Sequence, residues 1–69
     1  MRYGNIRQIE AFHCLMVTGS MTMAARMMGV TQPAISRLLK DLQADLKLTL
    51  FEKHGTGVAP TAEATALYA

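Results

Sequence analysis

The 69-residue chain carries seven Lys and Arg against five Asp and Glu, a formal net charge of +2, and 51% of its residues are hydrophobic. A chain of this length forms one small domain, and so many apolar residues exclude a disordered tail. The small net charge permits a nucleic-acid partner without requiring one. The single cysteine excludes an internal disulfide, and no apolar run approaches the roughly 18 residues of a membrane span. We therefore expect a cytoplasmic domain with no membrane partner.

Two helices are expected first, because apolar residues recur there at helical spacing between residues that favour helix ends. Over residues 5–18 the expected cap is Asn5, Gly19 ends the helix, and the apolar face comprises Ile6, Ile9, Phe12, Leu15 and Met16. Ser20 caps the second helix and Gly29 ends it. The apolar face of this helix comprises Met21, Ala24, Ala25 and Met28. Its paired alanines leave room for another helix to approach closely.

The third helix begins with an unusual stretch, "VTQPAISRLLKDL", residues 30–42. Thr31 is the expected N-cap, and Pro33 falls in the first turn, where a missing amide has no intrahelical partner to lose. The core-facing stripe is Ile35, Leu38, Leu39, Leu42 and Leu46. The opposite face carries Gln32, Pro33, Ser36, Arg37 and Lys40. Polar and basic residues so close to a helix start need an explanation other than core packing.

A β-hairpin and a further helix start are expected after residue 47. "LTLFEK" alternates and is rich in strand formers, "HGTG" is a turn, and "VAP" is a short return strand. Pro60 restricts the return strand to a sheet edge. Thr61 is the expected cap of a last helix, with Glu63 near its positive end.

Two short helices joined by "MGVT" have the layout of a helix-turn-helix, which accounts for the third helix. The N-terminal half of a recognition helix must enter the major groove, and the small residues Pro33 and Ala34 keep this end of the third helix narrow. The side-chain amide of Gln32 can pair with the edge of an adenine. Arg37 can reach guanine or phosphate. Phosphate contacts are expected from Thr31, Ser36 and Lys40. The hairpin, residues 48–60, then serves as a wing whose expected contacts are Lys53, His54 and Thr56.

Residues 7–53, "RQIEAFHCLMVTGSMTMAARMMGVTQPAISRLLKDLQADLKLTLFEK", resemble the N-terminal domain of the LysR-type bacterial transcriptional regulators. The most specific pieces are "GS", "AA", "TQPAISR" and "LFEK". The resemblance implies a mainly α fold, a winged helix-turn-helix of three helices and a short β-hairpin over residues 1–60. Residues 61–69 then begin a linker helix that pairs two subunits into a homodimer. The effector-binding domain of the family is expected to be absent here, and with it any cofactor or effector site.

By position, the resemblance implies sequence-specific double-stranded DNA binding, with the recognition helix, residues 31–42, in the major groove. The implied DNA contacts are Gln32, Pro33, Ser36 and Arg37, and the residues near phosphates are Ser20, Thr22 and Thr31. The sequence departs from the family pattern at three informative positions. Gln43 stands where the family usually has glutamate, Lys47 where it usually has glycine, and Lys53 where it usually has arginine. Lysine at position 53 lacks the bidentate fork of an arginine guanidinium.

Some alternatives remain open from the residues alone. A winged helical module could bind a protein partner instead of DNA, through leucine- and methionine-rich surfaces. Cys14 next to His13 has no second Cys or His pair to complete a metal site, and no residue set suggests an enzyme. Leu67 and Tyr68 either cover the first helix of their own domain or begin a dimer interface.

Overall fold

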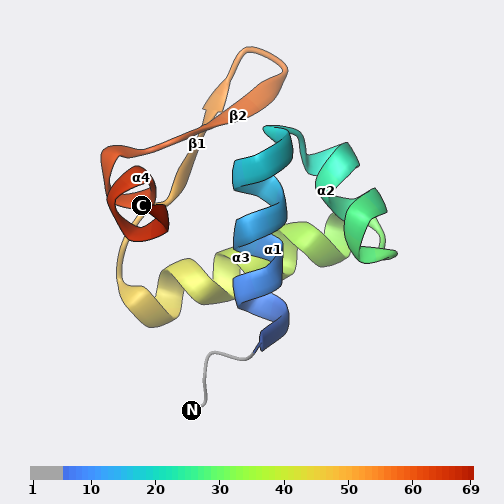
Figure 1. Ribbon diagram of the computed structural model, residues 1–69, viewed down its shortest axis with the longest axis horizontal. Helices are drawn as coiled ribbons and strands as arrows, with labels where there is room; N and C mark the ends of the chain where they lie inside the picture. Colours follow the sequence, from blue (N-terminus) through green and yellow to red (C-terminus); the bar gives the residue numbers. More distant parts are fainter. Residues whose placement is uncertain (1–5) are drawn as a thin grey trace.

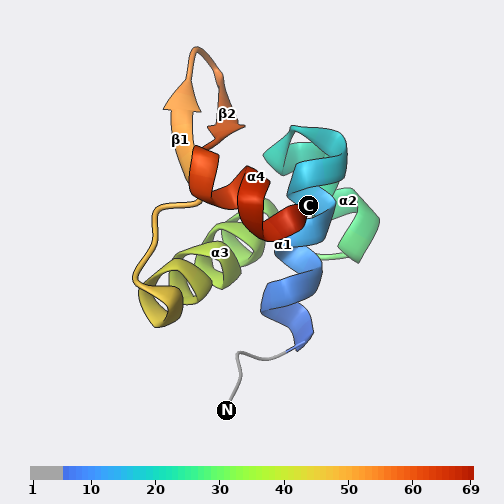
Figure 2. The same ribbon diagram turned by 60° about the vertical axis from the view of Figure 1, so that its left-hand side comes forward.

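The computed structural model describes residues 6–69, as four helices and a β-hairpin (Figure 1). The elements are α1 (Ile6–Thr18), α2 (Met21–Met28), α3 (Gln32–Leu46), β1 (Phe51–His54), β2 (Gly57–Pro60) and α4 (Ala62–Tyr68). α1 runs through the middle of the molecule, α3 crosses it, and the hairpin projects from the helical body (Figures 1 and 2). This is the predicted mainly α, winged helix-turn-helix fold. The expected cap Asn5 lies outside the described residues.

The helix starts follow local side-chain chemistry, as predicted. Ser20, Thr31 and Thr61 are the N-caps of α2, α3 and α4, and each accepts a hydrogen bond from the amide three residues on, at 3.2, 3.3 and 3.2 Å. Each hydroxyl satisfies an amide that the helix itself leaves unpaired. Gly29 ends α2 with a φ of 68°, a left-handed conformation that glycine adopts without steric cost. No helix within residues 6–69 is long and apolar enough to cross a membrane.

One hydrophobic core lies where α1, α2 and α3 meet. Its buried residues are Ala11, Phe12, Cys14, Leu15, Ala24, Ala25, Ile35, Leu39, Leu42, Leu50 and Ala64. The two alanines of α2 are 0% and 5% exposed, so this short helix packs closely against its neighbours as predicted. Cys14 is buried among these side chains as a small apolar residue.

The prediction for the apolar face of α1 was wrong in part. Ile6 and Ile9 are 75% and 54% exposed, whereas Gln8 and Ala11 are buried. The core face therefore follows positions 8, 11, 12 and 15, an i, i+3, i+4, i+7 pattern displaced around the helix from the expected one. Both faces of α1 carry apolar residues, and only packing against α2 and α3 selects between them.

The end of α3 also differs from the expected stripe, because the helix continues past the core. Ile35, Leu39 and Leu42 are buried, but Leu46 in the last turn is 40% exposed. Lys47 then ends the helix in the left-handed region, with a φ of 58°, and its amide donates to Ala44 O at 3.3 Å. Lys47 is the only non-glycine residue with positive φ in the described chain.

The hairpin is antiparallel, and Phe51 pairs with Pro60 at its base while His54 pairs with Gly57 at its tip. β1 begins three residues later than the predicted strand, since residues 48–50 form no strand. Leu50 is 0% exposed, and its amide donates to the side chain of Gln43 instead of to a strand partner. The first half of "LTLFEK" thus connects α3 to the wing.

Candidate nucleic-acid interface

A cleft of about 700 Å³ lies between the starts of α2 and α3 and the hairpin. We refer to it as the helix–wing cleft. It is lined by Gly19, Ser20, Met21, Thr22, Gln32, Pro33, Ser36, Lys53, Thr56, Gly57 and Val58. Seven predicted DNA contacts, from three separate parts of the chain, therefore border one concave surface: Ser20, Thr22, Gln32, Pro33, Ser36, Lys53 and Thr56.

The start of α3 presents its polar side chains to this cleft. Gln32, Pro33 and Ser36 are all exposed, and the Thr31 cap sets where the helix begins. The N-terminus of a helix carries about half a positive charge, which attracts anions. Because the buried stripe of α3 faces the core, the side chains that α3 itself presents to the cleft are small or polar.

The start of α2 borders the same cleft through Ser20 and Thr22. The Ser20 amide donates to Thr18 Oγ1 at 3.2 Å, and Thr18 Oγ1 in turn donates to Cys14 O at 2.8 Å. These bonds fix the turn between α1 and α2. The Ser20 and Thr31 hydroxyls use an oxygen lone pair for their caps, so each keeps an O–H that can donate to a phosphate oxygen.

The hairpin supplies the third side of the cleft. Lys53 lies in β1 opposite Val58 in β2, and Thr56 follows Gly55 in the turn. Lys53 and Thr56 line the cleft, whereas His54, though exposed, does not. The structure therefore places two of the three predicted wing residues at the helix–wing cleft.

Arg37 and Lys40 lie along α3, outside the helix–wing cleft. With Asp41 they line a neighbouring depression of about 420 Å³, which shares Pro33 and Ser36 with that cleft. The two hollows form one surface that continues along α3. Thr31 lines neither hollow and lies at the N-terminus of α3 as its cap.

The positive charges of this surface are not neutralised by ion pairs. In residues 6–69 the one ion pair joins Arg7 to Glu10, at 3.9 Å, on α1. Arg37, Lys40 and Lys53 are exposed. Their charges are available to an anionic partner.

Two apolar side chains of the cleft, Met21 and Val58, were missed as site residues. Met21 was predicted only as part of the apolar face of α2, and both pack against the core while lining the cleft. The sequence carries no signal for this double role, because it depends on where the hairpin folds back onto α2 and α3.

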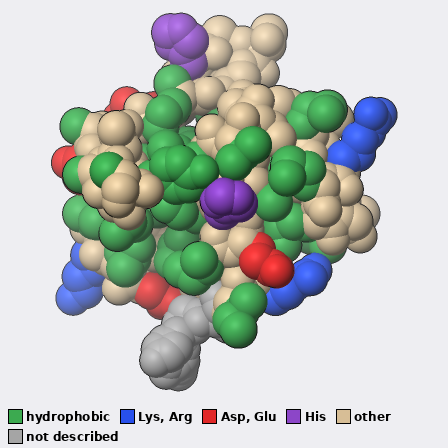
Figure 3. Space-filling model, in the orientation of Figure 1, with side chains coloured by type: hydrophobic (Ala, Val, Ile, Leu, Met, Phe, Trp, Pro, Cys, Tyr) green, Lys and Arg blue, Asp and Glu red, His purple; other side chains and the backbone are tan. Residues whose placement is uncertain are grey.

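Leu67 and Tyr68 lie on α4, away from the helix–wing cleft. The Tyr68 ring contacts Phe12 edge-on at a centroid distance of 6.0 Å and His13 at 5.6 Å. Tyr68 thus covers α1, which is one of its two expected roles, yet it and Leu67 remain 42% and 50% exposed. Hydrophobic side chains gather over this face, with Lys and Arg at its margins (Figure 3).

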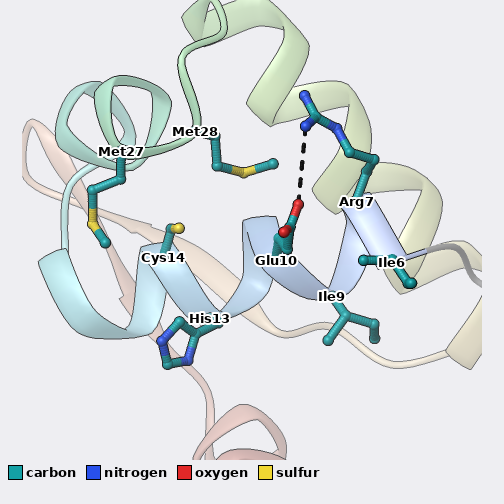
Figure 4. Close-up of a pocket in the computed structure, with 8 residues that line it drawn as sticks. All are labelled: Ile6, Arg7, Ile9, Glu10, His13, Cys14, Met27 and Met28. Atoms are coloured by element: carbon teal, nitrogen blue, oxygen red, sulfur yellow. Dashed lines mark ion pairs between the residues drawn. The ribbon is translucent and has the colours of Figure 1, made fainter.

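A third hollow, of about 610 Å³, lies between α1 and α2 (Figure 4). Its apolar lining residues are Ile6, Ile9, Cys14, Met27 and Met28, and Arg7, Glu10 and His13 also border it. It shares no residue with the helix–wing cleft. No group of three His, Cys, Asp or Glu side chains among residues 6–69 is placed to hold a metal ion.

Comparison with known proteins identifies the family. Residues 6–65 match the family described as "Bacterial regulatory helix-turn-helix protein, lysR family". The chain belongs to the LysR family of bacterial regulatory proteins. The predicted resemblance is thereby confirmed.

Relatives of this chain include proteins named as regulators. The octopine catabolism/uptake operon regulatory protein OccR of Rhizobium meliloti is 56% identical over 64 residues, which are 93% of this chain and 22% of OccR. The regulatory protein NocR of Agrobacterium fabrum is 50% identical over 62 residues, 90% of this chain and 21% of NocR. The chain spans about a fifth of the length of these two relatives.

Solved structures with the same fold include protein–DNA complexes. A CbnR_DBD–DNA complex has a TM-score of 0.85 and 35% identity, and the match covers 91% of this chain and 72% of that one. A BenM_DBD complex with catB site 1 DNA has a TM-score of 0.85 and 28% identity, covering 93% of this chain and 72% of that one. The LysR-family fold of this chain is therefore one that also occurs bound to DNA.

Proposed function

We propose that this domain binds double-stranded DNA sequence-specifically, with the N-terminal half of α3 in the major groove and the hairpin beside it. The observation that carries the proposal is the helix–wing cleft, where α2, α3 and the hairpin present hydroxyl, amide and ammonium groups to one concave surface. The DNA complexes of CbnR_DBD and BenM_DBD support it, because both share this fold.

Base reading falls to the first two turns of α3. A major groove about 12 Å wide admits a helix, and the slim start at Pro33 allows close approach. The Gln32 amide offers one donor and one acceptor, which match the N7 and N6 edge of adenine. Arg37 can donate to the two acceptors of guanine or to a phosphate. Ser36 directly precedes Arg37 on α3. Each good base contact contributes about 1–3 kcal/mol of discrimination.

Phosphate binding positions the domain without reading sequence. Ser20 and Thr31 sit at the positive ends of α2 and α3, where helix amides and the free hydroxyl proton favour an anion. Thr22 lines the same cleft as Ser20, and Lys40 lines the neighbouring depression farther along α3. On the wing, Lys53, His54 and Thr56 contact the DNA backbone or the adjacent minor groove, Lys53 and Thr56 from within the cleft and exposed His54 from outside it.

We further propose that the domain is the reading head of a transcriptional regulator, in keeping with the regulatory names of OccR and NocR. In this role α4 begins a linker helix, and Leu67 and Tyr68 belong to a homodimer interface. Both are large hydrophobic side chains that are about half exposed, which supports a partner there. Two-fold pairing would match a DNA site with two half-sites.

Fluorescence anisotropy on a labelled duplex, across a salt series, tests DNA binding. Log affinity should fall with log salt by about 0.9 for each phosphate contacted, because counterions are released. Arg37→Ala should abolish or strongly weaken binding. Arg7→Ala, which removes an arginine paired with Glu10 on α1, should leave it unchanged.

A folded domain that does not bind at low salt would refute the proposal and favour the protein-interaction alternative. Equal losses from the two arginine variants would refute the placement of the interface on α3. Binding that does not change with salt would also contradict the proposed DNA binding. Binding to phosphates releases counterions, whereas an apolar interface does not.

A further inference from the structure

The side chain of Gln43 joins α3 to the hairpin. Its Oε1 accepts two backbone hydrogen bonds, from Leu50 N at 2.6 Å and from Phe51 N at 3.1 Å. Phe51 is the first residue of β1. One oxygen on α3 therefore satisfies two consecutive amides at the point where the wing begins.

Gln43 also lies on the same side of α3 as the cleft residues. Ser36, Lys40 and Gln43 follow i, i+4 and i+7 spacing, which places them in one row. A recess of about 180 Å³ between α3 and the wing is bordered by all three of these residues and by Phe51 and Val58. The row that begins in the helix–wing cleft at Ser36 thus ends at the anchor of the wing.

Leu50 is held on its other side by Thr61. Leu50 O accepts from Thr61 N at 2.9 Å, and the Thr61 hydroxyl proton is shared between Thr49 O at 2.6 Å and Leu50 O at 3.3 Å. The Leu50 side chain is 0% exposed. The peptide that leads into β1 is therefore fixed at its N–H by α3 and at its C=O by the residue that caps α4.

We propose that Gln43 is a positioning residue for DNA binding, which sets the angle of the wing so that Lys53 and Thr56 close the helix–wing cleft. This inference rests on the proposed DNA-binding function. The wing tip lies about four residues beyond Phe51, or about 13 Å at strand rise. A tilt of about 15° at the anchor would move the tip by about 3 Å, which is enough to break a hydrogen bond to DNA.

The chemistry required at position 43 is an acceptor oxygen at the end of two methylenes. Glutamate offers the same oxygen with a charge, so Gln43→Glu keeps the anchor. Gln43→Met has a similar length without the acceptor and leaves two amides unsatisfied. Gln43→Asn keeps the amide group but withdraws it by one methylene.

A double-mutant cycle between positions 43 and 53 tests the proposal on the labelled duplex. With Gln43 present, Lys53→Ala should lower affinity several-fold and reduce the salt slope by about 0.9, the loss of one phosphate contact. In the Gln43→Met background, Lys53→Ala should cause no further change in either quantity. In the Gln43→Glu background its full effect should return.

A merely structural role for Gln43 is separated by a matched control. Ala11→Gly weakens α1, far in sequence from the wing, and should leave the effect of Lys53→Ala intact. Amide hydrogen exchange gives an independent readout, since the Leu50 and Phe51 amides should lose protection in Gln43→Met but not in Ala11→Gly. If Gln43→Met does not fold, Gln43→Asn takes its place in the same cycle.

An undiminished Lys53 effect in Gln43→Met or Gln43→Asn would overturn the proposal. The proposal would also be overturned if Lys53→Ala bound the duplex as tightly as the wild type. The wing would then make no charged contact for Gln43 to position. Absence of DNA binding by the folded wild-type domain is a different result, which refutes the proposed function itself. The exchange protection of Leu50 and Phe51 still reports on the anchor in that case.

Discussion

Lys47 occupies a backbone conformation that suits glycine, so Lys47→Gly should stabilise the domain. Its φ of 58° and ψ of 39° lie in the left-handed region, which costs an L-residue roughly 1–2 kcal/mol. Glycine removes that cost but adds unfolded-chain entropy of about 0.4–1 kcal/mol. Loss of a cation at the end of α3 costs a few tenths of a kcal/mol, about 0.3 at this exposed site. The net expectation is a gain of about 0.5 kcal/mol.

Lys47→Ala is the matched control, because it removes the charge and keeps the left-handed strain. Glycine should exceed alanine in stability by about 1 kcal/mol, which is a difference of about 4–8 °C in Tm for a domain of this size. Thermal unfolding followed by circular dichroism at 222 nm measures both variants. Equal melting temperatures, or a more stable alanine variant, would show that Lys47 is not strained and would refute this reasoning.

Three further outcomes are expected. Gln32→Ala should relax sequence choice, whereas Lys40→Ala should weaken cognate and random duplexes alike; anisotropy on both duplexes measures this, and equal patterns for the two variants would contradict the assigned roles. Lys53→Arg should tighten binding, because a guanidinium binds phosphate with two parallel hydrogen bonds, and an unchanged Kd would argue against a wing contact. Thr61→Val should lower stability by about 1 kcal/mol or more, through the lost cap of α4, and thermal unfolding should show a much smaller loss for Thr65→Val.

Features set by neighbouring residues were predictable from the sequence. Ser20, Thr31 and Thr61 all act as the expected caps, since a cap needs only its own side chain and an amide three residues on. Gly29 ends α2 for an equally local reason. The recognition helix could be placed because its cap, its proline and its polar face lie within a few residues of one another.

Features set by distant contacts were not predictable in the same way. The choice between Ile9 and Ala11 for the core face of α1 depends on how α2 and α3 pack, and both positions are apolar. The late start of β1 depends on Gln43, whose Oε1 accepts hydrogen bonds from the backbone amides seven and eight residues farther along the chain. Position 43 could be noted as a departure from the family pattern, but its partners required the structure.

The two-stranded sheet has a consequence for the behaviour of the domain at high concentration. Within the described chain β1 and β2 pair only with each other, so both outer edges are open to strands of other molecules. Each strand has four residues, Glu52 and Lys53 place charges on β1, and Pro60 removes an amide from the end of β2. These features discourage edge-to-edge aggregation. The wing can therefore project from the helical body without pairing with the wing of another molecule.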